Sequence, residues 1–145
     1  MIIRSKVPLR LGLAGGGSDV VTNQPVIARG DCSWEELQSI HNKMETELGK
    51  AGSFLDAIYV CPHHPDKGFK GERPEYKKEC DCRKPKTGLF LQAANAFNID
   101  LSQSYMIGDS DNDMIAGGEF CAKSFKIQSN DSKALFEIIT EYIVK

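Results

Sequence analysis

The hydrophobic and polar positions of the chain follow two periods, and each predicts a kind of element. Apolar residues every three or four positions predict helices, and short apolar or alternating runs predict strands. One helix begins at a capping box, because the Ser33 hydroxyl can bond the Glu36 amide while the glutamate side chain returns to the cap. We expect helices over 34–48 and 89–97, a helix start at 111–116 and a helix over 135–143, with strands over 2–13, 57–60, 105–107 and 120–127.

Strands and helices therefore alternate, which favours an α/β fold with a mainly parallel sheet. Ligands of such sheets collect at the carboxyl ends of the strands, so polar residues that follow a strand are the candidates for a site. Residues 64–80 show little periodicity, and a loop of this length in a compact domain needs a tether.

Composition and charge restrict the partners. The 145 residues are 41% hydrophobic and 26% charged, as in a globular domain, and the net charge of -2 argues against nucleic acid, which requires a basic face. No apolar stretch approaches the roughly 20 residues that a membrane span requires. We therefore expect a cytoplasmic protein that binds a small molecule and neither nucleic acid nor a membrane. The oligomeric state stays open.

The most specific chemical signal is a pair of segments, CPHHP from residue 61 and CDC from residue 80. In an extended segment residues i and i+2 point the same way, so Cys61 pairs with His63, and Cys80 with Cys82. Together they complete a tetrahedral Cys3His set for zinc. Protein would fill all four positions, so this zinc would be structural and would tether the long loop. A redox pair or chance clustering is the alternative.

A second signal is the segment YMIGDSDND, in which an apolar strand ends at Gly108 and delivers Asp109 to its carboxyl end. There a carboxylate and a substrate phosphate could together hold Mg²⁺. Asp113 follows four residues later and can share the same face of a helix. A helix cap with a polar turn is the alternative, since Asp, Ser and Asn favour such positions.

Two further segments carry groups that suit a phosphate. Arg83 and Lys84 precede a helix start, and the lysine could neutralise charge that develops in phosphoryl transfer. Thr22 and Asn23 follow an apolar run, where a hydroxyl and an amide could bond phosphate oxygens. A solvated basic turn and a polar turn are the respective alternatives.

In their order along the chain, these four signals resemble the motifs of the haloacid dehalogenase (HAD) superfamily. The segments VVTNQ, IARG, CPHHP, CDCRKP and GDSDND are similar to zinc-containing phosphatases of D-glycero-D-manno-heptose 1,7-bisphosphate, with histidinol-phosphate phosphatase as the near relative. The resemblance covers roughly three quarters of the chain, from Val20 to about Ile127. It implies a HAD-like, Rossmann-type three-layer fold and hydrolysis of the 7-phosphate, for heptose-nucleotide, lipopolysaccharide or surface polysaccharide precursors.

The resemblance also implies roles for single residues. Lys84 and Asp109 would be catalytic. Asp109 would be a ligand of Mg²⁺, and Asp113 would hold Asp109 in place without contacting the ion. A phosphorylated sugar would be bound by Thr22, Asn23, Gln24, Arg83, Lys84 and Ser110.

The nucleophile motif of this family, DxDG, does not occur in the sequence. In the family one aspartate attacks phosphorus and a second, two residues later, acts as acid and base. Residues 1–19 contain one acid, Asp19, and resemble instead the start of a GHMP heptose 7-phosphate kinase. We therefore expect a kinase-like segment 1–19 and an N-terminally truncated HAD-like domain 20–145, with very low or no activity. The alternatives are a non-catalytic, zinc-stabilised phosphosugar-binding module, or a first motif supplied by a separate chain.

Overall fold

The computed structural model describes residues 2–4, 17–121, 123–128 and 131–143. Of the predicted strand over 2–13, only the first residues therefore belong to the described part of the chain. Within the described residues, no helix combines the length and the apolar character that crossing a membrane requires.

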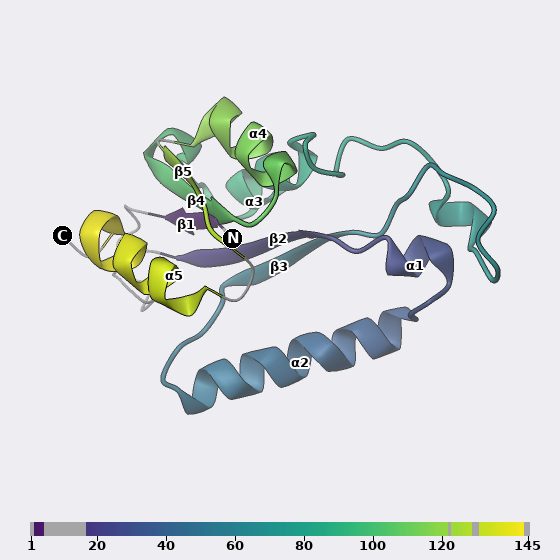
Figure 1. Cartoon of the computed structure of the whole chain (residues 1–145), viewed down its shortest axis with the longest axis horizontal. Coiled ribbons are helices and arrows are strands. Elements are labelled where there is room, and N and C mark those ends of the chain that lie inside the picture. The colour runs from purple at the N-terminus through teal and green to yellow at the C-terminus, as the bar shows by residue number, and fades with distance from the viewer. Residues whose placement is uncertain (1, 5–16, 122, 129–130, 144–145) are drawn as a thin grey trace.

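A five-stranded sheet forms the centre of the structure, in the order β3-β2-β1-β4-β5 (Figure 1). Its strands are β1 (Ile2–Arg4), β2 (Ser18–Asn23), β3 (Ala57–Cys61), β4 (Ser104–Gly108) and β5 (Lys123–Lys126). β2 is parallel to β3, and β4 is parallel to β5, whereas β1 is antiparallel to both of its neighbours. The four longer strands consequently run the same way and end at one edge of the sheet.

The register of β1 places it beside the amino-terminal halves of its neighbours. Ile2 lies opposite Asp19 of β2 and Met106 of β4. The carboxyl ends of β2 and β4 extend beyond these pairs, towards the predicted site. β2 also runs without a break across the predicted boundary between residues 19 and 20, and the division into two segments stays a prediction.

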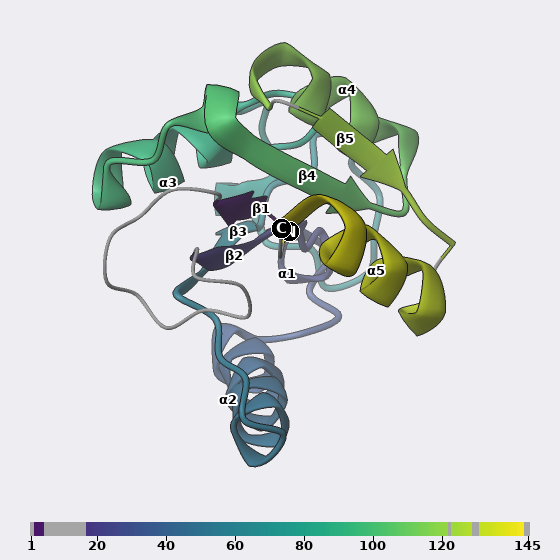
Figure 2. The ribbon, with the colours of Figure 1, turned by 90° about the vertical axis from the view of Figure 1, so that its left-hand side faces the viewer.

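Helices cover both faces of the sheet, which gives the three layers that the resemblance implied (Figures 1 and 2). The helices of the described residues are α1 (Val26–Arg29), α2 (Trp34–Lys50), α3 (Gly88–Phe97), α4 (Asp111–Phe120) and α5 (Ser132–Ile138), with 3-10 turns η1 (Pro74–Tyr76) and η2 (Leu101–Gln103) and a π-helical turn η3 (Ile139–Ile143). On the face that α3 and α4 cover, Phe90 and Met106 are fully buried. On the other face, Leu135 and Ile138 of α5 pack against Ile107.

Most predicted elements are confirmed, and two boundaries are wrong: the last helix begins at Ser132, three residues before the predicted start, and one strand is too long. The capping box of α2 is present, since Ser33 Oγ accepts from the Glu36 amide (3.1 Å) and Glu36 Oε2 accepts from the Ser33 amide (2.7 Å). The strand predicted over 120–127 covers only Lys123–Lys126, because Phe120 still belongs to α4. Residues 120–127 contain no glycine or proline, so the sequence pattern alone did not mark the end of the helix.

Candidate metal and phosphate site

The structure brings together the four residues predicted as metal ligands. Cys82 Sγ lies 3.1 Å from Cys61 Sγ and 3.3 Å from both Cys80 Sγ and His63 Nδ1. All four ligand atoms lie within 4.8 Å of one another. Two come from the end of β3 and two from the far end of the loop, so the cluster closes this loop on the sheet.

The separations of Cys61 from Cys80 and from His63 fit one tetrahedral ion, and the three that involve Cys82 are shorter than such an ion requires. With Zn–S near 2.3 Å and Zn–N near 2.0–2.1 Å, a tetrahedron separates two sulfurs by roughly 3.8 Å, and a sulfur from a nitrogen by roughly 3.6 Å. The Cys61–Cys80 and Cys61–His63 separations are 3.6 and 3.8 Å. Three thiolates and an imidazole are the ligand set of a structural zinc site, so the cluster could hold a metal such as zinc.

Electrostatics supports the same conclusion. Burial raises the pKa of the Cys82 thiol, and the adjacent Cys61 and Cys80 sulfurs raise it further, because neighbouring thiolates repel one another. Burial and the charge of Lys78 lower the pKa of His63, which keeps the imidazole neutral, the form that binds a metal. A divalent cation would offset the repulsion among the thiolates.

His64 has a different role from His63. It is buried, its Nδ1 accepts from the Asp66 amide (3.2 Å), and its ring meets the edge of Phe69 (5.8 Å between centroids). The i, i+2 parity therefore selected the histidine that lies beside the three cysteines.

The loop between the two ligand pairs packs against α1. The Phe69 ring lies between the Arg29 guanidinium (5.1 Å) and the Lys77 ammonium (4.6 Å). Gly30, with φ of 78°, ends α1 in the left-handed region, and a Cβ there would overlap the carbonyl of Gly71. Glycine at this position thus permits the loop to approach the helix.

A cavity of about 320 Å³ opens where β2 and β4 end. It is lined in part by Thr22 from β2, Lys84 from the loop, and Asp109 and Asp113 from the β4–α4 turn. Residues from three separate motifs of the sequence therefore meet at one place, at the carboxyl edge of the sheet.

Lys84 and Asp113 form a buried ion pair in this cavity. Lys84 Nζ lies 2.5 Å from Asp113 Oδ1, and it also donates to Val21 O (2.7 Å). Ser110 Oγ donates to Asp113 Oδ2 (2.7 Å) and accepts from the Asp113 amide, as the N-cap of α4. Both carboxylate oxygens of Asp113 are thus engaged, and the exposed Asp109 lines the same cavity.

The other predicted substrate contacts, Asn23, Gln24, Arg83 and Ser110, are not among the residues that line this cavity. Gln24 Nε2 donates to Thr22 Oγ1 (3.1 Å), so the threonine hydroxyl acts as acceptor there and keeps its hydrogen for another acceptor. Arg83 Nη1 donates to His63 O (3.1 Å). Asn23 binds the main chain of Lys84, which the sequence pattern did not reveal, because 61 residues separate the two.

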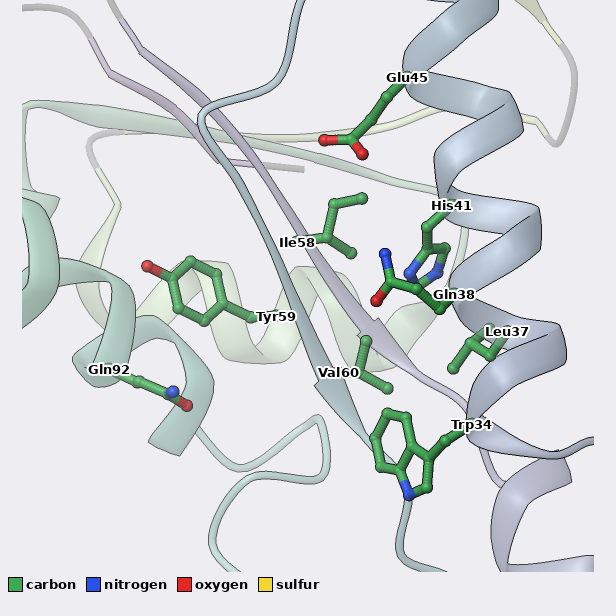
Figure 3. A pocket seen from close by; sticks show the side chains of 9 residues that line it. All are labelled: Trp34, Leu37, Gln38, His41, Glu45, Ile58, Tyr59, Val60 and Gln92. Atoms are coloured by element: carbon green, nitrogen blue, oxygen red, sulfur yellow. The ribbon is translucent and has the colours of Figure 1, made fainter.

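A larger cavity, of about 410 Å³, lies between α2 and β3 (Figure 3). Ile58 and Val60 point into it from the strand, facing Trp34 and His41 of the helix. None of the predicted site residues lines it. Of these two cavities, the smaller one is therefore the one lined by predicted phosphate-site residues.

Comparison with known proteins finds relatives that are similar to this chain in sequence. The D-glycero-beta-D-manno-heptose-1,7-bisphosphate 7-phosphatase of Vibrio cholerae is 38% identical over 130 residues, which are 86% of this chain and 68% of that protein. The chain belongs to this phosphatase family. The Yersinia pestis member is 47% identical over 97 residues, 67% of this chain and 50% of its own length. The chain thus spans about half to two thirds of these relatives.

Two further matches agree with this family. The HAD-hydrolase-like family model matches residues 81–134, which include Lys84, Asp109 and Asp113. The crystal structure of D,D-heptose 1,7-bisphosphate phosphatase from B. bronchiseptica, in complex with magnesium and phosphate, superposes with a TM-score of 0.66 at 34% identity. The match covers 83% of this chain and 62% of that one. The HAD-like fold predicted from the sequence is confirmed.

Proposed function

We propose that this chain binds the phosphate of a phosphorylated heptose in the cavity between β2 and β4, and that its family reaction is hydrolysis of the 7-phosphate of heptose 1,7-bisphosphate. The observation that carries the proposal is the meeting of Thr22, Lys84 and Asp109 around one cavity. The family relatives are named for this reaction.

The charges of the site suit a phosphate. A lysine ammonium has three hydrogens, and among the described residues Val21 O and Asp113 accept two of those of Lys84. The third remains for a phosphate oxygen, and the Thr22 hydroxyl can donate from the end of β2. Mg²⁺ held by Asp109 would neutralise further phosphate charge. Arg83, Gln24 and Ser110 stay predicted substrate contacts.

We expect the purified 145-residue chain to turn over slowly or not at all. Its sequence contains no DxDG, and the nucleophile and the acid–base group of the family both come from that motif. The chain would then act as a phosphosugar-binding module in the cytoplasm, or would receive the motif from a separate chain. A neighbouring reading frame that encodes a DxDG segment would favour the second case.

A phosphate-release assay tests the catalytic part. We expect little inorganic phosphate from heptose 1,7-bisphosphate and Mg²⁺. Turnover of about 1 to 1000 per second, the ordinary range for enzymes, would show that another group supplies the nucleophile.

Calorimetry tests the binding part. Heptose 1,7-bisphosphate should bind in the presence of Mg²⁺, and Lys84→Ala should weaken binding, whereas Lys126→Ala, far less buried, should not. Histidinol phosphate serves as a competing ligand, and tighter binding of it would favour the histidinol-phosphate alternative. If neither ligand nor inorganic phosphate binds, the proposed function is wrong.

A further inference from the structure

The carboxamide of Asn23 makes two hydrogen bonds to one residue far away in sequence. Asn23 Nδ2 donates to Lys84 O (3.1 Å), and Asn23 Oδ1 accepts from the Lys84 amide (3.0 Å). Both groups of the side chain therefore bind the main chain of the residue whose ammonium enters the cavity. A carboxamide suits this task because it carries a donor and an acceptor side by side.

The same strand also holds the other end of Lys84. Its Nζ donates to Val21 O, two residues before Asn23 on β2. One strand thus binds the lysine at its main chain and at its ammonium. A lysine side chain loses up to about 2 kcal/mol of conformational entropy when it is fixed, so a main chain already held in place favours the single ordered position.

The segment that carries Lys84 is bound to Asn23 and is also connected to the Cys3His cluster, through Cys80 and Cys82. Cys82 lies two residues before Lys84, and Arg83 Nη1 donates to His63 O. Asn23 is opposite Cys61 in the register of β2 and β3, and the Gln24 amide donates to Cys61 O (2.8 Å). Asn23 therefore connects the end of β2 directly to the turn between the cluster and the cavity.

We propose that Asn23 is a positioning residue, which fixes the main chain of Lys84 so that the ammonium stays between Val21 O and Asp113, ready for a phosphate. This deepens the proposed function, since it assigns to the phosphate-binding lysine the group that orients it. Asn23 acts through Lys84, and its effect on phosphate binding depends on the lysine side chain.

The position of the ammonium can be measured without any ligand. In ¹⁵N-labelled chain, a buried and hydrogen-bonded ammonium gives a slowly exchanging ¹H–¹⁵N cross-peak, assigned by its loss in Lys84→Arg. We expect this peak in the wild-type chain and in Asn42→Ala, a control on the exposed face of α2. It should disappear in Asn23→Ala and be weakened in Asn23→Asp, which keeps the acceptor and loses the donor. An unchanged peak in folded Asn23→Ala would overturn the proposal.

A double-mutant cycle with inorganic phosphate and Mg²⁺ then tests dependence on the lysine. Asn23→Ala should weaken binding about five- to tenfold in the wild-type background, as expected for loss of one or two hydrogen bonds. In the Lys84→Ala background the same change should alter affinity by less than about twofold. Equal losses in both backgrounds would mean that Asn23 contacts phosphate itself or acts only on stability, and would overturn the proposal. If the wild-type chain binds no phosphate, the proposed function fails, while the cross-peak still decides the role of Asn23.

Discussion

Lys84 Nζ and Asp113 Oδ1 lie 2.5 Å apart in a largely buried ion pair, with 11% and 5% of the two side chains exposed. An exposed pair in the same chain, Lys126 and Asp111, has the same separation with 51% and 85% exposed. The two pairs differ in burial and not in distance, and burial decides what each contributes.

Lys84→Ala should destabilise the fold by about 3–5 kcal/mol, because it leaves the Asp113 carboxylate buried without its partner. Lys126→Ala should cost no more than about 1 kcal/mol, since water solvates both of its charges. Urea unfolding of the three proteins measures the difference. Equal losses would show that burial does not set the contribution of the pair.

The contribution of this pair should depend on pH. Burial raises the pKa of the Asp113 carboxyl, but the hydrogen bond and charge of Lys84, with hydrogen bonds from Ser110, lower it to below its ordinary value. A carboxyl whose pKa is lower in the folded state stabilises the fold above its unfolded pKa and loses this contribution as pH falls through the folded pKa. The advantage of the wild-type chain over Lys84→Ala should be complete near pH 6 and shrink below about pH 4. Urea titrations across this range check it, and a constant difference would contradict it.

Purified chain should contain about one zinc ion, measured by elemental analysis. Cys80→Ser should abolish zinc binding and lower the melting temperature, because the loop then loses its closure at the sheet. Cys32→Ser provides the control, since this cysteine lies outside the cluster. Retention of stoichiometric zinc by Cys80→Ser would exclude the predicted ligand set.

Removal of zinc should change the fluorescence of Trp34, the one tryptophan of the sequence. Its Nε1 donates to Tyr76 Oη (2.8 Å), and the Tyr76 ring lies 6.0 Å from that of His63. We expect the emission to move to longer wavelength with chelator, and the response to be smaller in Tyr76→Phe, which lacks the hydroxyl. An equal response in the variant would show that the hydrogen bond does not transmit the change.

Gly108→Ala should destabilise the chain by about 1–3 kcal/mol, because the new Cβ would overlap the Asp113 side chain. Gly118→Ala in α4 has open space around its Cβ and should be neutral or stabilising by up to about 1 kcal/mol. Thermal unfolding compares the two. A neutral Gly108→Ala would mean that the β4–α4 turn can move away from the added methyl group.

Local geometry explains what could be predicted without a structure. The capping box at Ser33 requires only groups three residues apart, and the ligand pairs of the zinc site require only the alternation of an extended segment. The strand that ends at Gly108 also predicts where Asp109 is placed. In each case the interacting groups are close in sequence, so spacing is sufficient.

The sequence by itself thus determined the helix starts, the ligand pairs and the chemical types around a phosphate site. Only the tertiary structure decided that β1 lies antiparallel between β2 and β4, that Lys84 pairs with Asp113, and that Asn23 binds the main chain of Lys84. These contacts join segments tens of residues apart, and they depend on which strands become neighbours in the sheet. Spacing along a chain contains no information about that choice, because it results from the packing of the whole domain.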